Sequence, residues 1–104
     1  DSVGIFPEFI DGYGILVLPT TGRYYQLPYR SLLPQKVNNL IAAGRITGGD
    51  KTSHASTRNM MCCTVTGQAA GISAAISVKL KKNLRDLSIT ELSEELYKQR
   101  VRTR

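Results

Sequence analysis

The sequence has few of the residues that build metal centres and nucleophilic active sites. Its 104 residues include two cysteines and one histidine. Cys62 and Cys63 are adjacent, so on a helix their side chains diverge, and they match neither a C-x-x-C metal site nor an easy disulfide. His54 has Ser53 beside it rather than placed for a triad, and a hydrogen-bonded loop histidine explains it equally well. We therefore expect no metal site, and we assign no catalytic residue.

Targeting patterns and separated cysteine pairs are also absent from this sequence. Their absence favours a reducing, cytoplasmic location. The chain opens on Asp1 rather than methionine, and we interpret it as part of a longer polypeptide.

The sequence lacks the aromatic platform of a nucleic-acid-binding protein, although its net charge is +6. Residues 79–104 contain eight Lys or Arg against four Asp or Glu, which gives this end a net charge of +4. A basic end can bind an anionic partner, but stacking aromatic side chains do not accompany it here. We expect no nucleic-acid partner, and an anion-binding fragment is the least favoured alternative.

Residues 1–34 have the composition of extended structure. The apolar run Ile15–Leu18, the turn-forming Pro19–Gly22 and the strand formers of Arg23–Tyr29 together predict a hairpin. The apolar stretch over residues 37–44, which ends at a glycine, then predicts one buried strand.

A long stretch without proline follows, from about residue 56 to 82, and residues 60–78 carry no charge. We do not expect a membrane span, because polar residues and glycines interrupt the stretch and it contains neither Leu nor Phe. The alternative is a long buried helix over about 56–82, with small residues every fourth position on one face: Cys63, Gly67, Gly71 and Ala75. A short helix over about 89–100, capped by Ser88 or Thr90, would point Leu92 and Leu96 inward.

The loop between these elements comes close to a phosphate-binding loop. Gly44 and Gly49 have the spacing of G-x-x-x-x-G-K-[ST], but Asp50 follows and Lys51 arrives one position late. The lysine then misses the β- and γ-phosphates, and the carboxylate repels them, so we reject this interpretation. "GYGILV" at residues 12–17 likewise lacks the third glycine of a dinucleotide fingerprint.

The order of five short motifs carries a resemblance. They are a Pro28-Tyr29 turn, "NLIAAGR" at 39–45, a Gly-Asp/His loop, "RNMM" at 58–61 and "TGQAAG" at 66–71. The segment from Arg23 to about Lys79 resembles the C-terminal segment of FAD-dependent oxidoreductases of the glutathione-reductase-like flavoprotein superfamily. The resemblance implies an α/β fold, in which this chain is the C-terminal fragment of an FAD-binding Rossmann-like domain.

By the same resemblance, residues 1–34 would form the edge of a substrate domain, and residues 35–104 would be the C-terminal part of the FAD-binding domain. The cofactor would be FAD in the complete protein, held by the following residues of this segment: Gly44, Arg45, Gly49, Asp50, His54, Arg58, Asn59, Met60 and Met61. "RNMM" would precede or begin the helix whose N-terminus, with its unpaired N–H groups and partial positive charge, faces the flavin ring.

The resemblance also implies what else the protein needs. A G-x-G-x-x-G strand is absent here, so the remainder of the flavoprotein or a complementary chain would supply it, and a small molecule would be the substrate. The chain would close the flavin pocket of an oxidoreductase and be inactive without the dinucleotide-binding part. The alternative is a non-catalytic structural or assembly piece that uses its apolar helix as an interface.

Overall fold

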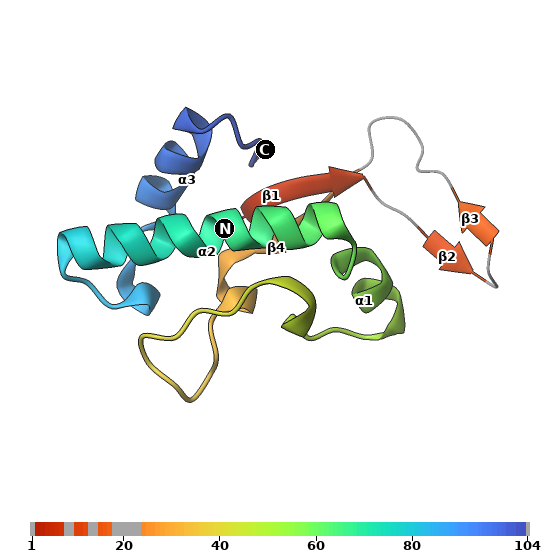
Figure 1. Ribbon diagram of the computed structural model, residues 1–104, viewed down its shortest axis with the longest axis horizontal. Helices are drawn as coiled ribbons and strands as arrows, with labels where there is room; N and C mark the ends of the chain where they lie inside the picture. Colours follow the sequence, from red (N-terminus) through yellow and green to blue (C-terminus); the bar gives the residue numbers. More distant parts are fainter. Residues whose placement is uncertain (1, 8–9, 13–14, 18–23, 104) are drawn as a thin grey trace.

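Two antiparallel strand pairs form from the first 28 residues. The computed structural model describes residues 2–7, 10–12, 15–17 and 24–103. β1 (Ser2–Pro7) pairs with β4 (Tyr24–Pro28), and β2 (Ile10–Gly12) pairs with β3 (Ile15–Val17), as Figure 1 shows.

The predicted hairpin between Ile15–Leu18 and Arg23–Tyr29 is therefore wrong in its pairing. Both runs contain strands, but β3 pairs with β2 and β4 pairs with β1. Two residues separate β2 from β3 along the chain, whereas six separate β3 from β4, so the observed pairing closes a shorter loop than the predicted one, at a lower cost in entropy. The predicted turn, Pro19–Gly22, lies outside the described residues.

The predicted buried strand over about 37–44 is also wrong. After the short 3-10 helix η1 (Tyr29–Leu32), residues 33–43 have no regular structure until a second such turn, η2 (Gly44–Ile46). Val37 and Leu40 are each 50% exposed, and the Ala42 N–H bonds back to the Leu32 carbonyl at 2.8 Å. A strand needs a neighbouring strand for its backbone groups, and this segment pairs with none of the four described strands.

The predicted long helix is confirmed over most of its length but not at its start. α2 runs from Met60 to Leu80, and a separate helix, α1 (Lys51–Thr57), precedes it. Asn59 is extended, with ψ at 157°, and it caps α2 with its side chain, which ends the first helix and starts the second. A 3-10 turn, η3 (Leu84–Asp86), then leads to α3 (Ile89–Lys98), which lies inside its predicted limits with Ser88 at the N-cap position.

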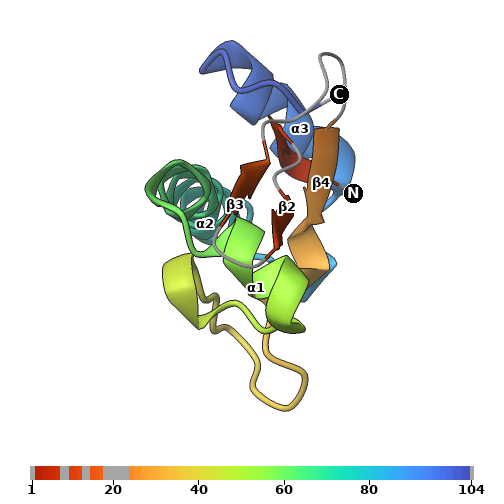
Figure 2. The same cartoon turned by 90° about the vertical axis from the view of Figure 1, so that its right-hand side faces the viewer.

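One hydrophobic core joins the strands to the helices. α2 contacts β1 and α3, and Figure 2, which looks along α2, shows the helix beside the strands. The buried core residues are Leu27, Tyr29, Leu32, Cys62, Ala69, Ile72, Leu92 and Leu96. The segment before residue 35 thus shares its core with the segment after it, while their proposed division between two domains stays a prediction.

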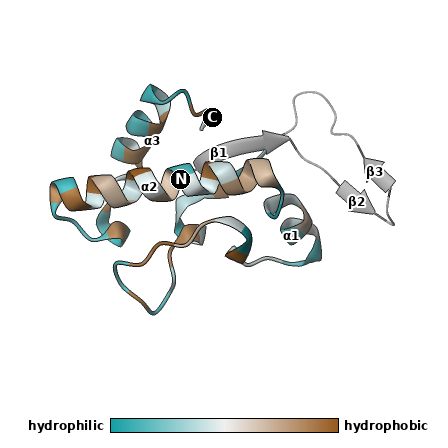
Figure 3. Ribbon diagram, viewed as in Figure 1, coloured by the Kyte–Doolittle hydropathy of each residue, from teal (hydrophilic) through white to brown (hydrophobic). Residues whose placement is uncertain are grey.

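Within this chain the predicted long buried helix, α2, is buried on one face only, and its burial against a partner chain or a second copy stays a prediction. Its inner face is buried through five residues: Cys62, Thr66, Ala69, Ile72 and Ser73. Gly67 and Gly71 belong to the outer face, where an added Cβ would meet no atom within 4 Å, and Met60 and Val78 are more than three-quarters exposed. Figure 3 shows α2 mostly in white and brown, whereas α3 is largely teal. By length and composition α2 is apolar enough to cross a membrane, with a mean hydropathy of 1.3 in its best window, 28% of which is buried.

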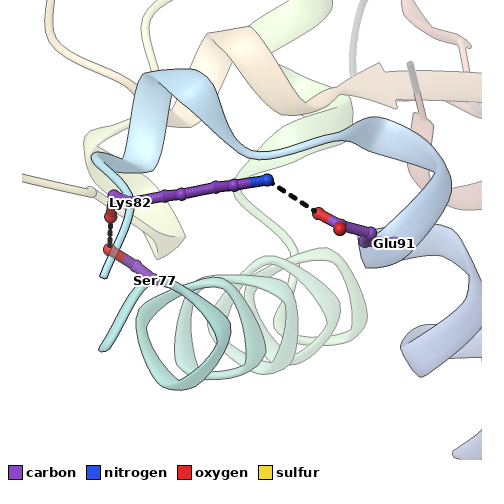
Figure 4. A network of polar contacts seen from close by, with 3 residues as sticks. All are labelled: Ser77, Lys82 and Glu91. Atoms are coloured by element: carbon purple, nitrogen blue, oxygen red, sulfur yellow. Dashed lines mark hydrogen bonds and ion pairs between the residues drawn. The ribbon is translucent and has the colours of Figure 1, made fainter. Parts of the chain in front are cut away.

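Polar contacts link the end of α2 to α3. Lys81 has a left-handed backbone with φ at 52°, and the Lys82 N–H then bonds back to the Ser77 carbonyl at 3.1 Å. Ser77 Oγ donates to the Lys82 carbonyl, and Lys82 Nζ lies 3.9 Å from a Glu91 carboxylate oxygen, as Figure 4 shows. The ion pair is half-exposed and contributes little, so the turn itself sets the path of the chain toward α3.

Candidate functional site

The η2 turn carries the first two predicted site residues and lies against α2. Gly44 has φ at 83°, a conformation that glycine adopts without strain, and its N–H donates to Thr66 Oγ1 of α2 at 3.0 Å. Its carbonyl accepts from the Thr47 hydroxyl at 3.0 Å. Gly44 is therefore held at both backbone polar groups.

Arg45 and Arg58 lie beside each other. Arg45 Nε donates to the Arg58 carbonyl at 3.1 Å, which bridges the η2 turn to the junction between α1 and α2. Both residues are exposed, and Arg58 precedes the first residue of α2 by two positions. The bond joins two predicted site residues that are 13 positions apart in the sequence.

Asp50 begins α1 instead of lining an open loop. Its Oδ1 accepts the Ser53 N–H at 2.7 Å, and its carbonyl accepts the His54 N–H at 2.8 Å. A Cβ added at Gly49 would lie 3.1 Å from Ser53 Cβ, so glycine leaves room for this first turn. An aspartate at the N-cap satisfies backbone donors that would otherwise be unpaired, which explains why this part of the predicted loop is helical. His54 is exposed on α1.

The N-terminus of α2 is where Asn59, Met60 and Met61 meet. Asn59 Oδ1 accepts the Cys62 N–H at 2.8 Å, and the Asn59 carbonyl accepts the Cys63 N–H at 3.0 Å. The N–H groups of Met60 and Met61 belong to the first turn and have no acceptor within the helix. Both methionine side chains are exposed, by 77% and 73%. The helix start thus presents donors, a partial positive charge and two flexible apolar side chains.

The nine predicted residues divide into two groups. Gly44, Arg45, Arg58 and Asn59 are connected directly or through α2, with both methionines on the first turn of that helix. Gly49 precedes α1, Asp50 caps it and His54 lies in its middle, and α1 contacts α2 (Figure 1). The two described hollows lie elsewhere: a groove of about 1000 Å³ runs along α3 to Val101, and one of about 430 Å³ adjoins Lys81. Neither of these two hollows is lined by a predicted site residue.

Sequence reasoning missed two residues that hold the site together. Thr66 accepts the Gly44 N–H, and the Tyr25 hydroxyl donates to the Ser56 carbonyl of α1 at 3.0 Å. Thr66 is 1% exposed and lies four residues after buried Cys62, so helical spacing on the inner face would have indicated its burial. Its bond to the loop has no signal in the sequence.

The Cys62 thiol lies in the core next to this site. Burial, and to a smaller extent the neighbouring Cys63, raises the pKa of Cys62 from the ordinary 9.0 to about 11. The neutral thiol therefore contributes stability that is complete below pH 9 and is lost as the pH rises toward 11.

We expect the free energy of unfolding to fall between pH 8 and pH 10 by about 1 kcal/mol on account of Cys62. Urea unfolding of the chain and of Cys62→Ala at both pH values measures this difference. The variant lacks the titrating thiol, so the pH-dependent loss should be smaller in it by that amount. Equal losses in the two chains would contradict the burial of this thiol.

Comparison with known proteins gives one match. A family model described as FAD dependent oxidoreductase matches residues 11–96, which spans β2 to α3 and includes every predicted site residue. No curated protein and no solved structure matches the chain.

Proposed function

Because the chain belongs to the FAD dependent oxidoreductase family, we propose that residues 44–61 form the flavin-ring side of its FAD site. FAD is the cofactor of the complete protein in this family, and when bound it accepts and passes on the electrons of the oxidised substrate. The observation that carries the proposal is the arrangement at the start of α2. There, the N–H groups of its first turn, which have no acceptor within the helix, follow directly after Arg58, whose carbonyl accepts from Arg45 Nε.

The residues present fit a flavin. A flavin gains negative charge when it is reduced, and a helix N-terminus together with two guanidinium groups stabilises such charge. Met60 and Met61 are exposed and apolar, so they can cover the ring and exclude water. Asp50, by contrast, already caps α1 with its carboxylate, so we assign it a role in shaping the loop.

Each part of the chain then has a separate task. The first turn of α2 donates its N–H groups toward the ring. Arg45 and Arg58 add positive charge there, and Gly44 allows the η2 turn to lie against α2. Holding these donors in place before the reaction means that little reorganisation is needed as charge develops.

The other half of the cofactor requires residues that this sequence does not contain. A dinucleotide fingerprint would bind the pyrophosphate, so we propose that the remainder of the flavoprotein or a complementary chain supplies it in a glutathione-reductase-like Rossmann arrangement. The outer face of α2 supports this, since a helix that is apolar on all sides normally lies between two layers. The chain would thus close the pocket and be inactive alone.

The test is the absorption spectrum and flavin content of the protein expressed from its complete gene. We expect one FAD per chain with flavin bands in the visible range. The 104-residue chain, titrated with FAD, should bind weakly because it lacks the phosphate-binding turn. Purified complete protein that neither contains nor takes up FAD would contradict the proposal.

A structural or assembly role is the second candidate, and the exposed, uncharged face of α2 favours it. The same preparation separates the two roles. A complete protein without flavin whose α2 is protected from hydrogen exchange by a partner would support assembly, whereas protection that appears only when FAD is bound would support the flavin site.

A further inference from the structure

We infer that Thr66 is a positioning residue for the flavin-ring side of the site, because its hydroxyl fixes the η2 turn to α2. The Gly44 N–H donates to Thr66 Oγ1 at 3.0 Å across 22 residues of sequence. Thr66 is 1% exposed, so water does not compete for this bond. The expected effect of Thr66 on flavin binding rests on the proposed function. Its expected effect on the loop rests on the geometry alone.

The hydroxyl of Thr66 has two functions at once. It lies 3.1 Å from the Cys62 carbonyl oxygen and 3.0 Å from the Cys63 carbonyl oxygen, and it donates its proton to this pair of acceptors. With its proton committed to the helix, its lone pairs face the loop and accept the Gly44 N–H. Thr66 therefore sets the distance between the loop and the first two turns of α2.

Arg45 directly follows Gly44, so the bond to Thr66 also fixes the backbone from which the Arg45 side chain extends. The loop has a second attachment, the bond from Arg45 Nε to the Arg58 carbonyl, which is exposed to water. This bond is more stable when the backbone before Arg45 is held in place. Without the Thr66 acceptor, the partly buried Gly44 N–H would lose its partner, and the loop would move outward to reach water. Thr66 thus acts on the flavin through Arg45, without touching it.

The test uses the protein expressed from its complete gene, with three variants. Thr66→Val keeps the shape of the side chain and removes the hydroxyl, whereas Thr66→Ser keeps the hydroxyl. The control, Ser73→Ala, removes another buried hydroxyl of α2, which lies two turns after Thr66 and donates to the Ala69 carbonyl. Hydrogen exchange of the peptide covering residues 41–48, by mass spectrometry, reports the loop. Titration of the apoprotein with FAD reports the site.

In Thr66→Val, we expect the amide hydrogens of this peptide to exchange about fivefold faster than in the wild type and FAD to bind about tenfold more weakly. Thr66→Ser should match the wild type within about twofold in both measurements, and Ser73→Ala should lower only the melting temperature. Should Thr66→Val give no soluble protein, Thr66→Ala takes its place.

Two results would overturn the inference. One is a Thr66→Val protein with wild-type exchange and affinity, and the other is a Thr66→Ser protein as impaired as Thr66→Val. A wild-type protein that binds no FAD would refute the proposed function instead, and the exchange measurement would still decide whether Thr66 holds the loop.

Discussion

Replacing Leu96 with alanine is expected to lower the free energy of unfolding of the chain by about 3–5 kcal/mol. Leu96 is 0% exposed and belongs, with Leu92, to the inner face of α3. It lies in the same core as Leu32 and Ile72, so its loss leaves a cavity between α3 and the rest of the molecule. A chain of this size has little stability in reserve, and urea unfolding followed by circular dichroism measures the loss.

The neighbouring residue is a matched control for this change. Tyr97 is larger than Leu96 but 79% exposed, so Tyr97→Ala should change the free energy of unfolding by less than about 0.5 kcal/mol. If the two variants lost equal stability, α3 would not be docked through Leu96, and the described core would be wrong.

The second large effect is expected at Arg45. In the protein expressed from its complete gene, Arg45→Met should weaken FAD binding by about 10- to 100-fold, because it removes the charge-assisted contact that we propose to the cofactor. The melting temperature of the apoprotein should change little, since Arg45 is exposed and its bond to the Arg58 carbonyl lies at the surface. Calorimetric titration of the apoprotein with FAD gives the affinity.

Arg85→Met is the control for charge. It removes the same charge from an exposed position in η3, outside residues 44–61. We expect its FAD affinity to stay within about threefold of wild type. A loss as large as that of Arg45→Met would mean that the overall positive charge, rather than the position of Arg45 beside Arg58, attracts the cofactor.

The start of α2 has a local cue in the sequence, although the helix is predicted from about residue 56. Asn59 precedes an uncharged run, and an asparagine in that position caps a helix with its own side chain, as it does here. Asp50 is an equally good cap, so the helix that it begins, where the sequence analysis expects a loop, has the same kind of cue. The bonds from Gly44 to Thr66 and from Arg45 to Arg58 cross 22 and 13 residues, so no local rule indicates them.

The sequence by itself determined the helix α2 except for its start, the helix α3 with Leu92 and Leu96 inward, and the family through the order of its motifs. Helices satisfy their own backbone groups, so spacing and caps are sufficient to define them. Only the tertiary structure decided which strands pair, that residues 37–43 form no strand in this chain, and that Gly67 and Gly71 face outward. Those outcomes depend on partners distant in sequence, because a strand is stable only beside another strand and an apolar helix face is buried only where another element covers it.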